Sequence, residues 1–157
     1  MLFRSTRNAE APRDRYLSTD EIGRLSAALD AHPNRRAADA VRLILLTGAR
    51  RGEVLNARWE QFDLDAAVWI KPAATTKQRR LHRAPISASA AALLRTIRVR
   101  VPEECDWVFP GNSQGKPLQD IKRFWDDIRA EAELPGVRIH DLRHTFASLL
   151  VSGGMTL

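Results

Sequence analysis

The sequence has one cysteine, Cys105, and one tyrosine, Tyr16. A lone thiol forms no internal disulfide and no cysteine-based metal site, which fits a reducing cytoplasm. Cys105 lies between acidic residues and Trp107, and we interpret it as a packing residue. No apolar run approaches the length of a membrane span, and the N-terminus lacks the apolar core of a signal peptide. We therefore expect a cytoplasmic protein without a membrane partner.

Lysine is also scarce, with four lysines against 21 arginines, and the net charge is +6. Guanidinium groups match phosphate oxygens in a bidentate way, whereas an ammonium acts as a point charge. A basic, arginine-rich domain is the electrostatic footprint expected of a protein that binds nucleic acid. Genome composition explains the total equally well, so the argument depends on where the arginines lie.

The 157 residues, 44% of them hydrophobic, suffice for one domain with an ordinary core. Residues 1–15 are polar and charged and predict a linker or N-terminal arm. Ser18 and Glu21 form a capping box for a helix ending near residue 32, and Gly48 is a natural stop for a second helix. The remaining pattern predicts helices starting at 51–53, over 88–99, over 118–132 and over 140–151, with strands at 67–70 and 82–86. The fold class is therefore mainly α with a small antiparallel β-sheet (α+β).

The first motif with chemical potential is TGARRGE at residues 47–53. Gly48 predicts a tight turn that places Arg50 at the start of a helix. Backbone amides and the helix dipole favour an anion there. The alternative is a surface arginine paired with Glu53.

The second motif is HDLRHT at residues 140–145. His140 and Arg143 share a helix face, so both can donate to one phosphate. The histidine can also act as a general acid or base. His144 lies one turn after His140 and allows a zinc-ligand alternative. That alternative lacks the glutamate that follows the first histidine in zinc hydrolases. An ordinary capping or core role for His140 is the other alternative.

Between the motifs, residues 73–81 (AATTKQRRL) are polar and very basic and predict a hairpin tip. Lys77 lies within this tip, and Arg79, Arg80 and Arg83 follow it. A lysine there could protonate a leaving oxygen during phosphoryl transfer. A charge run that only grips the DNA backbone is the alternative, and we favour it for Arg79 and Arg80.

These segments together resemble one family. The string TGARRGEVLNARWEQFD resembles the first box of the tyrosine recombinases (phage-type integrases), and IHDLRHTFASLLVSGG is similar to their second box. TKQRRLHRAPIS looks like the β-hairpin that carries the family's catalytic lysine. Order and spacing agree over about residues 16–154. The resemblance implies the DNA breaking-rejoining catalytic-domain fold, with a small three-stranded antiparallel sheet.

The resemblance also implies a mechanism. A tyrosine attacks a DNA phosphodiester and forms a 3′-phosphotyrosyl link, without a metal or cofactor. Arg50 and Arg143 look like the two arginines that stabilise the transition state. His140 resembles the proton-transfer or orienting histidine, and Lys77 the general acid for the departing 5′ oxygen. Lys71 fits that last role less well, because its distance to the following strand is less typical.

Other positions have supporting roles by the same resemblance. Glu53 resembles a structural acidic residue of the first box, and His144 lies behind the reacting groups. DNA-binding contacts are expected from Arg51, Arg79, Arg80 and Arg83. Double-stranded DNA is the implied partner, bound by a homo-tetramer of the intact enzyme.

The sequence departs from the family pattern in one major respect. The family's nucleophilic tyrosine lies beyond the second box, and this chain contains only Tyr16, which we interpret as an anchor at the domain entrance. Residues 16–157 are thus expected to form a catalytic domain incomplete at its C-terminus, without a nucleophile and with an exposed apolar patch. We expect site-specific recombination or integration in the intact enzyme and DNA binding in this chain. The alternative is a non-catalytic DNA-binding remnant of a degraded integrase. A metal-dependent nuclease would need carboxylate clusters that the motifs lack.

Overall fold

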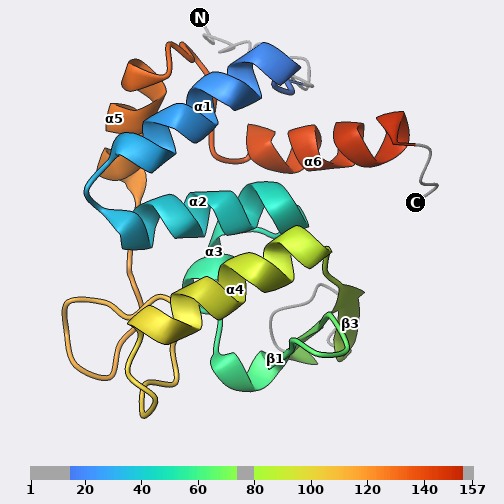
Figure 1. The fold of residues 1–157 in the computed structure, drawn as a ribbon, viewed down its shortest axis with the longest axis vertical. Coiled ribbons are helices and arrows are strands. Elements are labelled where there is room, and N and C mark those ends of the chain that lie inside the picture. Colours follow the sequence, from blue (N-terminus) through green and yellow to red (C-terminus); the bar gives the residue numbers. More distant parts are fainter. Residues whose placement is uncertain (1–14, 74–79, 154–157) are drawn as a thin grey trace, which may run out of the picture.

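The computed structural model describes residues 15–73 and 80–153 (Figure 1). Helices surround a central α2, and a small sheet lies at one end of the domain. In chain order the elements are α1 (Thr19–Ala31), α2 (Arg35–Thr47), α3 (Arg51–Leu55), the 3-10 turn η1 (Trp59–Gln61), β1 (Phe62–Asp63), β2 (Val68–Lys71), β3 (His82–Pro85), α4 (Ala88–Arg100), α5 (Lys122–Glu131) and α6 (Asp141–Ser152). The predicted class, mainly α with a small antiparallel sheet, is confirmed.

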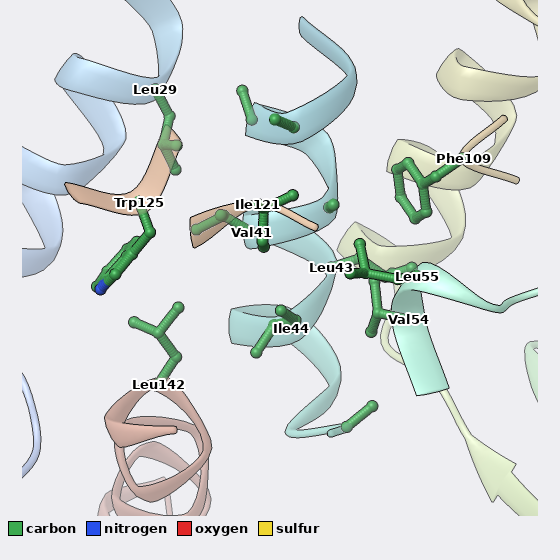
Figure 2. Packing of buried hydrophobic residues seen from close by; sticks show 14 of the residues in the cluster. Leu29, Val41, Leu43, Ile44, Val54, Leu55, Phe109, Ile121, Trp125 and Leu142 are labelled. Atoms are coloured by element: carbon green, nitrogen blue, oxygen red, sulfur yellow. The ribbon is translucent and has the colours of Figure 1, made fainter. Parts of the chain in front are cut away.

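Helix α2 forms the centre of the core and packs against α1, α3, α4 and α6. Its sequence allows this because small and branched apolar residues occur on several of its faces and are buried. Figure 2 shows Leu43 on the side of α2 toward Val54 and Phe109, with Leu142 of α6 on another side. Helix α2 thus connects the segment that follows it to α6, although α6 lies about a hundred residues further along the chain.

The predicted helix ends are confirmed where a local signal specifies them. At the start of α1, the Glu21 amide donates to Ser18 Oγ at 3.2 Å and the Ser18 amide donates to Glu21 Oε2 at 2.8 Å. At the end of α2, Gly48 adopts φ 65°, and its amide donates to the Ile44 carbonyl at 2.8 Å. The left-handed conformation is one that glycine adopts at no steric cost.

The sheet has the order β1-β2-β3 and is antiparallel throughout. Trp69 pairs with Phe62 on one side and Ala84 on the other, and Lys71 pairs with His82. The indole of Trp69 is buried and stacks on Phe62 with ring centroids 4.9 Å apart. Strand β1 has no periodic signal of its own, because it is two residues long and follows η1 directly.

Two expectations from the sequence were wrong. The helix expected from residue 118 begins at Lys122, because the Leu118 amide pairs with the Phe109 carbonyl and Asp120 accepts the amides of Ile121 and Lys122. Tyr16, expected as the anchor at the domain entrance, is 55% exposed.

The neighbouring Leu17 is the anchor instead. It is buried, and its amide donates to Thr145 Oγ1 of α6 at 3.0 Å.

Apolar side chains are exposed near the end of α6, where Leu149 and Val151 face solvent. Among the described residues, no helix is long and apolar enough to cross a membrane.

Candidate active site

The first motif forms the turn from α2 into α3. After Gly48, the buried Ala49 leads to Arg50, which is the N-cap of α3. The Arg50 amide donates to Glu53 Oε2 at 2.8 Å. Because a five-residue helix is not stable alone, this contact fixes the backbone from which the Arg50 side chain extends. That side chain remains 49% exposed.

The second motif forms the start of α6. Asp141 is buried, and its carboxylate accepts the Arg138 amide at 2.7 Å and Arg138 Nη2 at 3.1 Å. These bonds fix the turn before the helix, with His140 at the N-cap position and Arg143 in the first turn. The predicted start of this helix is confirmed.

The packing of α2 on α6 brings the two motifs together. The ring of Phe146 in α6 lies so close to Gly48 that a Cβ there would be 2.3 Å from Phe146 Cδ1. An open pocket of about 380 Å³ lies between the motifs. It is lined by Ile44, Ala49, Arg50, Arg51, Gly52, Ile139, His140 and Arg143. Arg50, His140 and Arg143, three of the predicted site residues, therefore line one cavity.

The electrostatics of this pocket favour an anion. Burial lowers the pKa of Arg143, and the positive charge of Arg50 lowers it further, while Glu53 opposes the shift. Burial is also the main cause that lowers the pKa of His140, followed by the charges of His144 and Arg143. Two guanidinium groups that repel each other across a pocket are both stabilised when an anion binds between them.

Glu53 directly follows Gly52, which lines the pocket, and its own side chain is 10% exposed. Its Oε2 is 3.1 Å from Lys71 Nζ, and its Oε1 is 3.6 Å from Arg50 Nη1. Burial acts to raise the pKa of Glu53, but the Arg50 amide and the Lys71 ammonium outweigh it, so the pKa lies below its usual value. The carboxylate is therefore ionised at neutral pH and connects α3 to β2.

The two histidines of α6 contact each other edge to face, with ring centroids 5.0 Å apart and an interplanar angle of 83°. His144 is half-buried and lies against His140. Within residues 15–73 and 80–153, no group of three or more histidine, cysteine or acidic side chains could hold a metal ion.

A model of the phage integrase family matches residues 15–157 of the sequence. This match covers nearly the whole chain and includes both motifs of the pocket. The chain belongs to the phage integrase family.

Curated relatives agree with this membership. The prophage integrase IntZ of Escherichia coli (strain K12) is 31% identical over 141 residues, which cover 88% of this chain and 34% of IntZ. The integrase of Salmonella phage P22 is 29% identical over 130 residues, covering 74% of this chain and 33% of that protein. The chain thus spans about a third of the length of these relatives.

Solved structures show the same fold. The XerA recombinase has a TM-score of 0.72 at 26% identity, over 90% of this chain and 52% of that chain. The Tn1549 transposon integrase, in complex with circular intermediate DNA, has a TM-score of 0.76 at 15% identity, over 94% of this chain and 57% of that chain. The predicted recombinase catalytic-domain fold is confirmed.

The basic hairpin of this integrase-family chain is described only in part. Lys77 and Arg79 lie outside the described residues. Arg80 and Arg83 are exposed, and Arg83 pairs with Ile70 in the sheet register. Arg51 also lines the pocket, and its Nη1 is 3.6 Å from Asp120.

Two contacts of the site were not found by reasoning from the sequence. The sequence indicates Lys71 only as an alternative general acid and does not predict its ion pair with Glu53. Asp141 was not assigned any function, although it fixes the turn before α6. The signal for Asp141 was available, since an acidic residue in the first turn of a helix is typical of an N-terminal cap. The Lys71 pair had no local signal.

Proposed function

We propose that this chain is the catalytic-domain part of a site-specific DNA recombinase or integrase. The intact enzyme would cleave and rejoin phosphodiesters of double-stranded DNA through a phosphotyrosine link. The observation that supports this most is the pocket in which Arg50, Arg143 and His140 converge around space for one phosphate. Family membership supports the same proposal, as does the likeness to an integrase solved with DNA.

In this proposal, Arg50 and Arg143 donate to the non-bridging oxygens of the scissile phosphate. These oxygens gain negative charge in the pentacoordinate transition state, so donors already aimed at them lower the barrier. Both arginines start from helix-terminal positions whose backbone is fixed by local hydrogen bonds to Glu53 and Asp141, so little backbone reorganisation is expected to accompany the reaction. Burial and the charges of His144 and Arg143 lower the pKa of His140, and its imidazole is proposed to transfer or orient a proton.

Lys77 is proposed as the general acid for the departing 5′ oxygen. Glu53 holds Arg50 in place, and His144 orients His140 through their ring contact. The nucleophilic tyrosine is assigned to no residue of this chain. Contacts to the DNA backbone are proposed for Arg51, Arg79, Arg80 and Arg83. We further propose that the intact enzyme acts as a homo-tetramer on DNA in the cytoplasm of a bacterial cell.

The binding test compares three variants that each remove one positive charge: Arg50→Ala, Arg143→Ala and the control Arg123→Ala. Arg123 is exposed on α5 and does not line the pocket. We expect the two pocket variants to bind short duplex DNA about tenfold more weakly, because a hydrogen bond to a charged group contributes about 1.5–3 kcal/mol. The slope of log affinity against log salt should also fall by about 0.9 for each phosphate that the variant no longer neutralises.

A second probe addresses the transition state. Vanadate adopts the pentacoordinate geometry of phosphoryl transfer, and a site complementary to that geometry binds it better than phosphate. Vanadate should therefore compete with DNA more strongly than inorganic phosphate does, and Arg143→Ala should remove this difference. Equal affinities of the pocket variants and Arg123→Ala would refute the site assignment. A wild-type chain that binds no duplex DNA would refute the function.

A further inference from the structure

Lys71 is one of the few lysines of the chain and has an unusual environment. It is the last residue of β2, and its side chain is only 13% exposed. The ammonium is 3.1 Å from Glu53 Oε2 and lies over the indole of Trp69, 4.6 Å from the ring centroid. Trp69 is itself buried and stacked on Phe62. The ammonium is therefore held in one place by an ion pair and a cation–π contact.

Glu53 has two cations beside it. Lys71 Nζ lies 3.1 Å from Oε2, and Arg50 Nη1 lies 3.6 Å from Oε1. The side chains of Lys71 and Glu53 are only 13% and 10% exposed, whereas the Arg50 side chain is 49% exposed and lines the pocket. A buried carboxylate that loses its partner draws in any cation within reach, because an unpaired buried charge is costly. The Arg50 guanidinium is within reach.

We propose that Lys71 is a positioning residue, whose ammonium forms the shorter ion pair with Glu53 and thereby keeps the guanidinium of Arg50 available to bind a phosphate. Glu53 then holds Arg50 by its backbone amide, while its charge is satisfied from the opposite side by the sheet. Without Lys71, the same carboxylate would pull the Arg50 guanidinium out of the pocket. This inference rests on the proposed phosphate-binding role of the pocket.

The proposal separates Lys71 from the role of general acid. A general acid must reach the leaving oxygen in the reacting complex. Lys71 is instead engaged by Glu53 and Trp69, and it is not among the residues that line the cavity. Its effect reaches the phosphate through Arg50.

The decisive variants are Lys71→Met and the double variant Glu53→Gln/Lys71→Met. In Lys71→Met, the charged Glu53 captures Arg50, so affinity for short duplex DNA should fall by about fivefold. This loss is smaller than that expected for Arg50→Ala, which removes the charged hydrogen bond entirely. In the double variant no carboxylate remains to capture Arg50, while the amide oxygen of Gln can still accept the Arg50 N–H. Affinity should then return to within about twofold of wild type. The remaining difference reflects the change in the charge of the protein near the DNA.

The matched control is Lys122→Met in α5. Lys122 also forms an ion pair, with Asp126 at 2.9 Å, but its side chain is 74% exposed and does not line the pocket. It reports the effect of removing one lysine charge on DNA affinity. Lys71→Arg should keep an affinity closer to wild type than Lys71→Met, because a cation remains beside Glu53.

NMR of the DNA-free protein tests the inference apart from the function. In Lys71→Met, the Nε–Hε resonance of Arg50 should shift and its fast side-chain motion should decrease, and the double variant should reverse both changes. An unchanged Arg50 resonance in Lys71→Met would overturn the proposal, whatever the DNA affinity. A double variant that binds DNA more weakly than Lys71→Met would also overturn it, because Lys71 would then serve stability alone. If Arg50 responds as expected but wild-type protein binds no DNA, the proposed function fails while the coupling stands.

Discussion

Replacement of Gly48 by alanine tests the contact that aligns the two halves of the site. Gly48 ends α2 at φ 65°, and a Cβ at this position would lie 2.3 Å from Cδ1 of Phe146 and 3.0 Å from Cε1. The substitution therefore combines a strained backbone with a steric clash. Both effects act where α2 meets α6, the helices that deliver Arg50 and Arg143.

The magnitude follows from the two contributions. A left-handed conformation costs a residue with a Cβ about 1–2 kcal/mol, and inserting a carbon into a packed contact costs about 1–3 kcal/mol. Gly48→Ala should thus destabilise the fold by about 2–5 kcal/mol, lowering the melting temperature by about 5–15 °C for a domain of this size.

Thermal and urea denaturation, followed by circular dichroism, measure this effect. Gly23→Ala is the control, because Gly23 lies inside α1 and a Cβ at that position would have nothing within 4 Å. It should stabilise the protein by about 0.5–1 kcal/mol, the helix-propensity difference. The clash is isolated by repeating Gly48→Ala in a Phe146→Ala background, where about 1–3 kcal/mol of the cost should disappear. An equal cost of Gly48→Ala in both backgrounds would show that Phe146 does not restrict this position.

Three further substitutions test separate contacts. The pKa of Glu21 is lowered to about 2 by its bonds to Arg15 and to the Ser18 amide. The stabilisation from this carboxylate is therefore present above the usual carboxyl pKa of 4.5 and disappears as pH falls towards 2. Urea denaturation of Glu21→Gln across this pH range should show a flatter pH dependence than that of wild type. His144→Gln should raise the pKa of His140, because one cause of its lowering is removed; an NMR titration that shows no rise would contradict this. Asp141→Asn should cost about 1–3 kcal/mol, since a buried acceptor of the Arg138 amide is weakened, and an unchanged denaturation midpoint would refute that role.

Local signals explain what the sequence could predict. Ser18 and Glu21 are three residues apart, and Gly48 directly follows its helix, so each helix end is specified by neighbours along the chain. The prediction of a helix start at residue 118 is wrong because a contact distant in the sequence decides that boundary. Apolar residues such as Leu118 continue its periodicity, but a backbone bond from Leu118 to Phe109 commits that residue to another partner. Tertiary bonding therefore decided the boundary that periodicity could not.

The same distinction applies to the site. The motifs predicted Arg50, His140 and Arg143, because each lies at a helix start that the sequence marks. For Glu53 the sequence offers Arg50 as the near partner, and the structure adds Lys71 of β2, 18 residues further along the chain.

This addition bears on the proposed mechanism of the site. A carboxylate balanced only by Arg50 would hold the group that is proposed to bind phosphate. We propose that Lys71, a second and half-buried cation, removes that conflict, because Glu53 can then fix the Arg50 backbone without binding its side chain tightly. In this proposal, the cations that pair with Glu53, as well as the residues that line the pocket, determine whether two arginines are available to one phosphate.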